Sequence, residues 1–341
     1  MYDSNTIIKD LRVLTESFIP RRIIHRDGQI NALRDNLKPL IDKEAPRNSF
    51  IYGPPGTGKT SMSQYVVDEL KAYSPVLSVY INCWLYPSRF KILYSILQSL
   101  GQIFIHRKGT PTDELLDLLR QKMKNRSCVI VLDEADQLED DKILYDLVET
   151  PGICIIMIAN KETIFYDADP RIRSRLESME RIEFRPYSTN EILDILKDRA
   201  EWGLVPHVIT PVQLNKIAEH SNGDARKAIG VLRAAAETAE NQDSELITDT
   251  HIEKAIPKSV SINQTKTLES LNVHQKILYG IIKSSRQVPS SDLYQKYSAV
   301  CREKDLEPLV DRTIRNHLEK LQSYNLISVS GEGRWTVYSS V

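Results

Sequence analysis

The segment from Gly53 to Thr60, GPPGTGKT, restricts the possible folds of this chain more than any other part of its 341-residue sequence. It fits the pattern G-x-x-x-x-G-K-[S/T], whose glycines let backbone N–H groups turn inward around phosphate oxygens. Local composition predicts a strand over Ser49–Tyr52 before it and a helix over Ser61–Ala72 after it. A glycine-rich turn without a ligand is the alternative, but the strand–loop–helix context favours a nucleotide-binding loop.

Each residue type in this loop suits one part of a nucleoside triphosphate. Main-chain amides and the positive end of the following helix attract phosphate oxygens. Lys59 is expected to reach the β and γ phosphates, and the Thr60 hydroxyl is expected to ligate Mg²⁺. The residues of this loop that we expect to bind ATP or ADP are Pro55, Gly56, Thr57, Gly58, Lys59, Thr60 and Ser61.

Two carboxylates follow a second apolar run, Cys128–Leu132. This run shows no polar alternation, as expected for a strand covered on both faces. In open α/β sheets, ligands bind beyond the carboxyl ends of the strands, which is where Asp133 and Glu134 stand. We expect Asp133 to hold Mg²⁺ through water and Glu134 to polarise the attacking water, both as catalytic residues. A carboxylate pair at an ordinary strand-to-helix turn is the alternative.

Two further residues belong to the expected catalytic set. Asn160 follows the apolar run Ile153–Ala159, whose strand should lie beside the strand that precedes Asp133, so that the Asn160 amide orients the attacking water. In Gly223–Arg226, GDAR, Asp224 is a plausible helix cap and Arg226 would point at the γ-phosphate. The alternatives are an ordinary turn asparagine and a surface arginine.

Three arginines, Arg171, Arg173 and Arg175, precede the last predicted strand of this region, Arg181–Phe184. One of them, with Arg175 included among the catalytic candidates, is expected to act as an arginine finger on the nucleotide of a neighbouring subunit. For any single one, a solvated arginine is an equally good interpretation. The sequence leaves open which of the three is the finger.

The order of predicted elements divides the chain into three domains. Residues 1–187 alternate β-branched runs, including Val76–Asn82, with helical patterns, which is typical of an α/β domain with a parallel sheet. Residues 188–260 show helical patterns only, and residues 265–341 show helices and then a hairpin. Residues 257–264 are predicted to be a linker.

Charge and composition restrict the partners of the chain. Its net charge of −1 excludes a polycation, so any nucleic-acid surface must be local. Residues 265–341 carry 11 Lys and Arg against 8 Asp and Glu, which favours this domain for phosphate contacts. The start of the chain lacks a secretory pattern, the apolar runs are too short for a bilayer, and the four cysteines are expected to be buried. We expect a cytoplasmic protein without a membrane partner.

The last domain resembles a winged helix in its pattern. A helix with a buried stripe of Val310, Ile314, Leu318 and Leu321 is followed by a hairpin of Ile327–Ser330 and Arg334–Tyr338. The polar face of such a helix enters the major groove of DNA, and a hairpin tip can enter a minor groove. The residues expected to contact DNA are Arg312, Arg315, Asn316, Lys320 and Arg334. A protein-binding winged helix is the alternative.

Taken together, GPPGTGKT, LDEAD, Asn160, the arginine-rich segment and GDAR resemble the nucleotide-site motifs of the AAA+ ATPases. Three segments narrow the resemblance to archaeal replication initiators similar to origin recognition complex subunit 1 and the cell division control protein. They are Ile19–Gln29, Ile81–Cys83 and Asp292–Tyr297. The resemblance implies an α/β, AAA+ parallel-sheet P-loop domain with a helical lid, followed by a C-terminal winged helix.

The resemblance also implies roles that spacing alone does not give. It places a pocket for the adenine base at Pro20, Ile23, Ile24, His25 and Arg26. It makes Trp84–Lys108 a helical insertion in which Arg89, Lys91, Arg107 or Lys108 contacts DNA, although the apolar positions of its helix by themselves indicate core packing. Many archaeal members have serine where this chain has Arg175, which puts its finger role in doubt.

The function implied is an ATP-dependent replication initiator that binds double-stranded origin DNA and helps recruit or load the replicative helicase. Other initiator paralogues are further candidate partners. Slow ATP hydrolysis would act as a switch, with Mg²⁺ as the second cofactor. The alternative is a clamp-loader-like or regulatory AAA+ ATPase that uses its winged helix as a protein adaptor.

Overall fold

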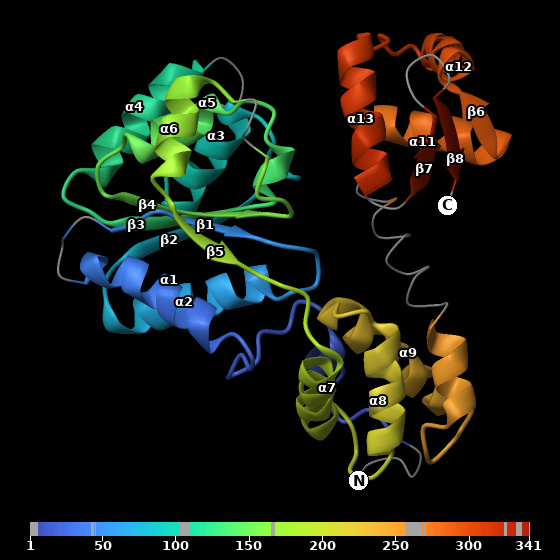
Figure 1. Ribbon diagram of the computed structural model, residues 1–341. Coiled ribbons are helices and arrows are strands. Elements are labelled where there is room, and N and C mark those ends of the chain that lie inside the picture. Colours follow the sequence, from blue (N-terminus) through green and yellow to red (C-terminus); the bar gives the residue numbers. More distant parts are fainter. Residues whose placement is uncertain are drawn as a thin grey trace. The chain divides into compact units, whose positions relative to one another are not determined.

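The computed structural model describes residues 6–41, 44, 46–102, 110–164, 168–256, 268, 271–323, 326–331 and 336–340. The chain forms two compact units, Met1–Ile256 and Pro257–Val341. The first contains a parallel sheet and a bundle of helices, and the second contains helices and a small antiparallel sheet (Figure 1). This arrangement confirms the predicted fold class.

The sheet of the first unit has five parallel strands in the order β2-β3-β4-β1-β5. The strands are β1 (Ser49–Tyr52), β2 (Leu77–Asn82), β3 (Cys128–Asp133), β4 (Ile153–Ala159) and β5 (Glu180–Glu183). The bounds of β1 and β4 are those predicted, whereas β2 begins one residue later and β5 lies one residue earlier than predicted. Every residue of β3 and β4 is buried, which explains their unbroken apolar runs.

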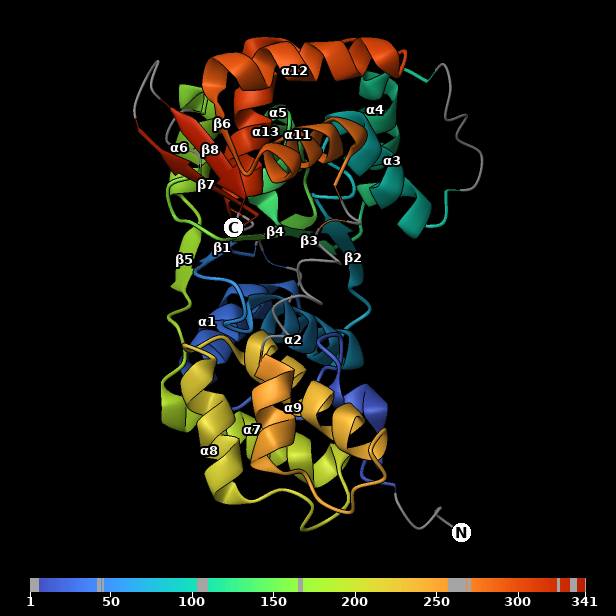
Figure 2. The same ribbon diagram turned by 90° about the vertical axis from the view of Figure 1, so that its right-hand side faces the viewer.

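Helices cover both faces of this sheet, as Figures 1 and 2 show from two directions. On one face lie α1 (Asp27–Leu37) and α2 (Lys59–Tyr73), with the short 3-10 helix η2 (Lys38–Leu40) after α1. The opposite face carries α3 (Arg89–Ser99), α4 (Thr112–Met123), α5 (Lys142–Val148) and α6 (Pro170–Glu177). The short 3-10 helix η3 (Ala135–Gln137) follows β3. These helices cover the faces of the sheet, and the loop of residues 53–60 lies at the carboxyl ends of the strands.

The helical part of the first unit has its own hydrophobic core. It contains α7 (Thr189–Gly203), α8 (Pro211–His220), α9 (Ala225–Glu240) and a helical segment over 249–256. The N-terminal segment, with the 3-10 helix η1 (Leu11–Leu14), packs against this core through Ile7 and Leu14. Ile8 forms a bridge with Leu204, and the Arg199 guanidinium donates to the Val13 carbonyl oxygen at 3.1 Å. The segment from Ile7 to Leu14 therefore packs on the helices that follow the sheet.

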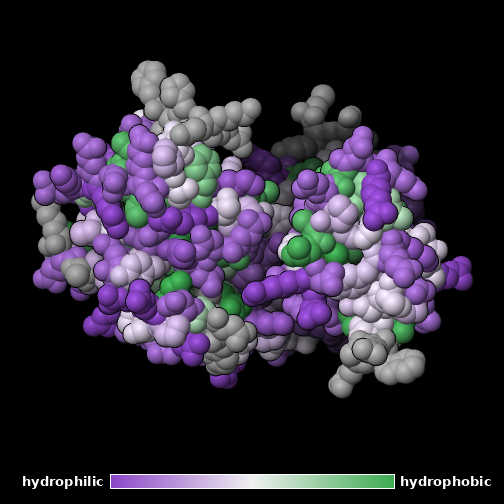
Figure 3. Space-filling view, turned by 90° about the horizontal axis from the view of Figure 1, so that it is seen from above, coloured by the Kyte–Doolittle hydropathy of each residue, from purple (hydrophilic) through white to green (hydrophobic). Residues whose placement is uncertain are grey.

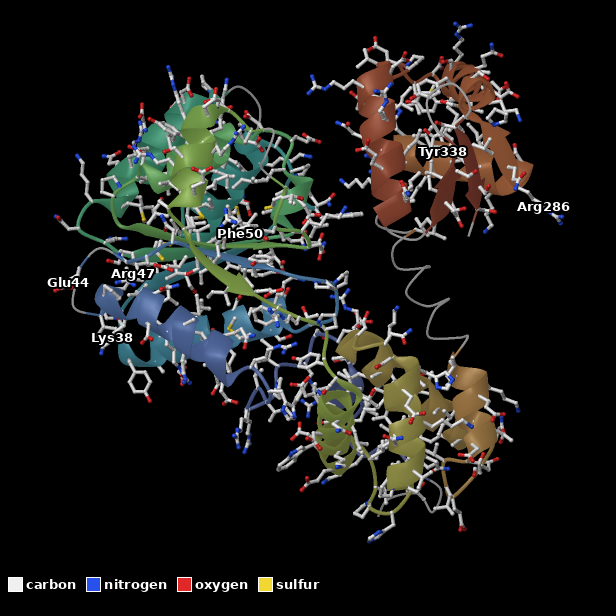
Figure 4. All side chains as sticks on the ribbon, viewed as in Figure 1. Lys38, Glu44, Arg47, Phe50, Arg286 and Tyr338 are labelled. Atoms are coloured by element: carbon white, nitrogen blue, oxygen red, sulfur yellow. The ribbon has the colours of Figure 1, made fainter. Side chains whose placement is uncertain are left out.

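The second unit combines α11 (Val273–Ser285), α12 (Ser290–Glu303) and α13 (Asp311–Ser323) with an antiparallel sheet of order β6-β8-β7. The strands are β6 (Gln287–Pro289), β7 (Ile327–Ser330) and β8 (Val337–Ser340). Figure 4 labels Tyr338, which is buried on β8, and Arg286, whose side chain extends outward. The first hairpin strand was predicted with its observed bounds; the second was placed too early, and β6 was not predicted.

One position of the expected apolar stripe in this unit was wrong. Ile314, Leu318 and Leu321 are at most 2% exposed, but Val310 is 71% exposed. The reason is that α13 begins at Asp311, so Val310 precedes the helix and does not share its buried face.

The protein presents a mostly polar face to water, and its cysteines lie inside, as predicted. The face in Figure 3 is mostly polar, with apolar side chains in small separate patches. All four cysteines are buried and unpaired. Within the described part of the chain, no helix has both the length and the apolar character that crossing a membrane requires.

Candidate nucleotide-binding site and DNA-binding surface

The GPPGTGKT loop joins β1 to α2 at the carboxyl edge of the sheet. Gly56 has a φ of +71°, which favours glycine, and a Cβ atom there would stand 1.8 Å from the Asp224 carboxylate. A Cβ atom on Gly53 would stand 2.0 Å from the Phe184 carbonyl oxygen. These glycines therefore let the loop turn and also let Phe184, directly after β5, and the start of α9 approach it closely.

Lys59 is buried at the first turn of α2. Its Nζ donates to the carbonyl oxygens of Gly53 at 2.6 Å and Pro54 at 2.8 Å, and lies 3.4 Å from Asn160 Oδ1. Burial lowers the pKa of Lys59 to about 8. The cation thus stands among loop carbonyls at the ends of β1 and β4, next to the amide predicted to orient water.

Thr60 and Asp133 meet directly, although 73 residues separate them. The Thr60 hydroxyl donates to Asp133 Oδ2 at 2.7 Å, and the Glu134 amide donates to Asp133 Oδ1 at 2.9 Å. A hydroxyl and a carboxylate at this distance are hard oxygen donors of the kind that Mg²⁺ prefers. The residues present therefore fit the predicted metal.

A residue that sequence reasoning missed completes this cluster. The Tyr80 hydroxyl, from the neighbouring strand β2, donates to Asp133 Oδ2 at 2.5 Å. Burial raises the pKa of this phenol well above its ordinary value, and the nearby Asp133 charge raises it further. Only the pairing of β2 with β3 brings the two together, so no local pattern in the sequence indicated it.

Glu134 and Asn160 lie at the ends of two adjacent strands, β3 and β4, as predicted. Glu134 has a φ of +56° although it is not glycine. Such a backbone costs on the order of 1–3 kcal/mol and is concentrated at functional sites. Glu134 marks the point at which the chain leaves β3 and turns into η3.

The start of α9 lies against the same loop. The Ala225 amide donates to the Gly56 carbonyl oxygen at 3.0 Å, and the Asp224 side chain caps α9 by accepting from the Lys227 amide at 3.1 Å. Arg226 is close enough that its charge contributes to lowering the pKa of Lys59, after burial and against the effect of Asp133. Its Nε lies 3.6 Å from Glu16. Arg226 is therefore placed beside the loop, at the first turn of the lid helix.

Arg26, predicted to border the adenine base, is buried and heavily engaged. Its Nε donates to the Thr57 carbonyl oxygen at 3.2 Å, one η nitrogen donates to the Arg185 carbonyl oxygen at 2.9 Å, and its guanidinium lies 3.7 Å from the Tyr187 ring centroid. Arg26 thus links the nucleotide loop to the segment between β5 and α7. Tyr187, a second residue missed by sequence reasoning, stacks on it.

The rest of this predicted pocket is arranged around Arg26. Ile23 is buried, and Pro20 and Ile24 are half-buried. His25 has a φ of +60°, and its Nε2 lies 3.2 Å from the Asp194 carboxylate on α7. Of the loop residues, Thr57 is buried with Lys59, whereas Pro55 is exposed and Ser61 is half-buried.

The arginines of α6 and α3 have different partners. Arg175 pairs with Glu149 at 2.7 Å, Arg173 donates to the Ala168 carbonyl oxygen at 3.3 Å, and Arg171 is exposed. Arg89 pairs with Asp146 at 2.5 Å and with Asp113 at 3.1 Å. Arg89 therefore joins α3 to α4 and α5, Lys91 is exposed, and Arg107 and Lys108 lie outside the described residues.

Comparison with protein families matches three successive parts of the chain. Residues 42–163 match an AAA domain, residues 193–257 match the Cdc6 AAA+ ATPase-type lid domain, and residues 266–341 match the C-terminal winged helix domain of CDC6. ORC1-type DNA replication protein 9 of Halobacterium salinarum is 41% identical, over 99% of this chain and 95% of that protein. The chain belongs to the ORC1-type DNA replication proteins.

Solved structures show the same fold as this ORC1-type chain. The Aeropyrum pernix ORC1 protein in complex with DNA matches it with a TM-score of 0.81 at 24% identity, over 98% of this chain and 94% of that one. The Aeropyrum pernix ORC2 protein, in ADPNP–ADP complexes, matches it with a TM-score of 0.69 at 24% identity, over the same shares.

In the winged helix of this ORC1-type chain, α13 exposes the polar residues predicted to meet DNA. Arg312, Arg315 and Asn316 are exposed, and Lys320 is half-buried. Arg334, predicted at the tip of the hairpin, lies outside the described residues. A buried face of Ile314, Leu318 and Leu321 fixes α13 on its unit, which leaves the opposite, basic face of the helix to solvent.

Proposed function

We propose that this ORC1-type protein is an ATP-dependent replication initiator that binds origin DNA and helps recruit or load the replicative helicase. One observation carries the nucleotide part of the proposal. Lys59, Thr60, Asp133 and Asn160, which come from three separate segments, are joined by hydrogen bonds of 2.7–3.4 Å at one edge of the sheet. Such a cluster of a cation, a hydroxyl, a carboxylate and an amide suits a bound triphosphate.

In this proposal each residue keeps one task. The loop amides and Lys59 hold the phosphates, Thr60 and Asp133 hold Mg²⁺, and Glu134 accepts the proton of the attacking water. Mg²⁺, when bound, supplies positive charge to the phosphate oxygens. The residues of the adenine pocket are those named above, Pro20, Ile23, Ile24, His25 and Arg26. The finger would be Arg171, Arg173 or Arg175 of a neighbouring copy or paralogue.

Hydrolysis in this proposal is a slow switch. Arg226, at the first turn of α9, would contact the γ-phosphate and so make the position of the lid depend on whether ATP or ADP is bound. The effect of the Arg226 charge on the pKa of Lys59 supports this role, since it shows that Arg226 lies near the lysine of the loop. We further propose domain limits of 1–187, 188–260 and 265–341, and action in the cytoplasm.

The DNA part of the proposal rests on α13. Its exposed residues Arg312, Arg315 and Asn316 form a polar face opposite a buried apolar one. A helix of this kind can donate to base edges in the major groove while its basic residues meet phosphates. The Aeropyrum pernix relative with the same fold was solved with DNA, which supports this assignment.

The nucleotide site is tested by Lys59→Ala, with Lys71→Ala on the exposed surface of α2 as the matched control. Calorimetric titration with ATP and Mg²⁺ should show binding by the wild type and the control, and none by Lys59→Ala. Equal ATP affinity in all three proteins would refute the assignment.

The DNA surface is tested by Arg315→Ala, with Lys304→Ala, exposed after α12, as the control for basic charge. At fixed salt, we expect Arg315→Ala to weaken binding to the host's origin duplex by about 1–3 kcal/mol, and the control to change it much less. An unchanged dissociation constant for Arg315→Ala would favour the alternative, a regulator that uses its winged helix as a protein adaptor.

A further inference from the structure

Tyr80 combines an exposed ring with an inward-pointing hydroxyl. It lies on β2, the edge strand of the sheet, between Val79 and Ile81, which are buried against the α3–α4 face. Tyr80 must therefore point to the opposite face, where α2 lies. Tyr80 as a whole is 41% exposed, yet its hydroxyl lies 2.5 Å from the buried Asp133 carboxylate. Packing of an edge strand does not require this contact.

Asp133 is held by donors from three directions. Oδ2 accepts from the Thr60 hydroxyl at 2.7 Å and from the Tyr80 hydroxyl at 2.5 Å, and Oδ1 accepts from the Glu134 amide at 2.9 Å. A carboxylate offers about four acceptor positions. These bonds occupy three of them, so about one position on Oδ1 is left for another donor, such as a metal-bound water.

The Tyr80 bond also removes a freedom that Asp133 would otherwise have. The terminal torsion of an aspartate is broad, so a carboxylate held by one side chain alone can rotate. Thr60 and Tyr80 approach Oδ2 from different elements, α2 and β2, and together with the Glu134 amide on Oδ1 they fix the plane of the carboxylate. Partners that orient a metal-binding carboxylate typically contribute about 10–100-fold to metal affinity or activity.

We infer that Tyr80 is a positioning residue for the divalent cation of the nucleotide site. Its hydroxyl holds Asp133 so that the remaining acceptor position faces the metal, while its ring closes the edge of the sheet beside the site. This inference rests on the proposed nucleotide function. It assigns Tyr80 an effect on the metal only, and none on the phosphates or the base.

The test is Tyr80→Phe, which keeps the ring and removes only the hydroxyl. Tyr73→Phe, at a position of α2 that is 78% exposed, is the matched control. For each protein, ATP affinity is measured by calorimetry with excess Mg²⁺ and again with EDTA, and thermal unfolding is recorded without nucleotide. The ratio of the two affinities gives the contribution of the metal.

We expect Tyr80→Phe to lower this ratio about tenfold, with ATP affinity in EDTA within about twofold of the wild type, and Tyr73→Phe to leave both unchanged. An unchanged ratio in Tyr80→Phe overturns the inference. So does a fall of both affinities by the same factor, with a lower melting temperature, because that result describes a structural tyrosine. If the wild type binds no ATP under either condition, the proposed function fails instead.

Discussion

The surroundings of Lys59 make its ammonium group easier to deprotonate. Burial lowers its pKa from 10.5 to about 8, while Asp133 raises it and Arg226 lowers it further. Phosphate oxygens beside the ammonium group would raise the pKa again, because an opposite charge favours the ionised form. Nucleotide binding and protonation of Lys59 are therefore linked, and proton uptake accompanies binding wherever the unbound lysine is neutral.

The linkage predicts how ATP affinity depends on pH. Below about pH 8 the unbound Lys59 is already charged, so affinity should be constant. Above that pH the affinity should fall, by at most about tenfold per pH unit, since binding must also restore the proton. Calorimetry between about pH 7 and pH 9.5, in buffers of different ionisation enthalpy, measures both the fall and the proton uptake. Lys59→Arg, which stays charged, should show neither; an equal fall in that variant would contradict the assignment to Lys59.

Arg26 shows a second effect at the scale of one residue, because one guanidinium serves two segments. It donates to the Thr57 carbonyl oxygen in the loop and to the Arg185 carbonyl oxygen before α7, and it stacks on Tyr187. A lysine keeps the charge but lacks the planar fork that makes these contacts together.

We expect Arg26→Lys to lower the free energy of unfolding by about 1–3 kcal/mol, because buried carbonyl oxygens lose their donors. ATP affinity should fall as well, since the loop loses its link to the lid. Thermal unfolding and ATP titration measure the two effects. Arg22→Lys, at an exposed position four residues earlier, is the control and should change neither. A wild-type melting temperature in Arg26→Lys would show that this link adds nothing to stability.

At the scale of elements, the nucleotide loop and the first turn of α9 fit together only because Gly56 has no side chain. A Cβ atom there would stand 1.8 Å from the Asp224 carboxylate, and the φ of +71° disfavours other residues. The same contact includes the hydrogen bond from the Ala225 amide to the Gly56 carbonyl oxygen, at 3.0 Å. The nucleotide loop is therefore also the surface on which the first turn of the lid helix α9 packs.

Gly56→Ala should therefore abolish or strongly weaken ATP binding and also loosen the lid. The expected signs are a loss of affinity of at least about tenfold and faster amide exchange at the start of α9 in the protein without nucleotide. Gly28→Ala is the matched control, because a Cβ atom at that position of α1 meets no atom within 4 Å. If amide exchange in α9 is equally fast in both variants, the packing of the lid does not depend on the loop.

The sequence predicts an element well where residues within the element itself determine it, and poorly where distant residues determine it. The strand β4 was found with its observed bounds because it is a run of seven apolar residues that are all buried. The strand β1, SFIY, was found because the glycine-rich motif directly follows it. The three-residue strand β6, Gln287–Pro289, is too short to show an alternation, and its pairing with β8 is set by the unit as a whole. Val310 was misplaced because helical periodicity does not show where a helix begins.

The candidate site divides in the same way. The residues of the loop and the two carboxylates at the end of β3 follow from motifs, since phosphate and metal binding restrict neighbouring residues along the chain. Tyr80 and Tyr187 do not, because their contacts with Asp133 and Arg26 join segments 53 and more than 100 residues apart. Only strand order and the path of the chain after β5 bring such pairs together.

At the scale of the whole molecule, charge is divided unevenly along the chain. Residues 188–260 carry 8 Lys and Arg against 12 Asp and Glu, whereas residues 265–341 carry 11 against 8. The negative segment contains the lid helices, and the positive one contains α13. Since DNA attracts local positive charge whatever the net charge of the chain, this division favours the second unit as the DNA-binding one.

In the proposed function, nucleotide and DNA bind to different units of the chain. If ATP and ADP change the affinity for origin DNA by some factor, then DNA must change the ratio of ATP to ADP affinities by the same factor. Couplings of this kind are typically about 5–150-fold. In the proposed mechanism the difference between ATP and ADP enters through Arg226, because this residue alone of the lid's first turn is assigned to the γ-phosphate.

Arg226→Ala should therefore reduce both factors to about one while leaving ADP affinity and DNA affinity in the ADP state close to those of the wild type. Arg233→Ala, which removes an arginine that pairs with Glu237 on the same helix, is the control and should keep both factors. Fluorescence anisotropy on labelled origin duplex gives the first factor, and nucleotide titration with and without duplex gives the second. If the two factors differ in the wild type, the protein has a further state that this scheme does not include. If Arg226→Ala keeps the full coupling, a residue other than Arg226 senses the γ-phosphate.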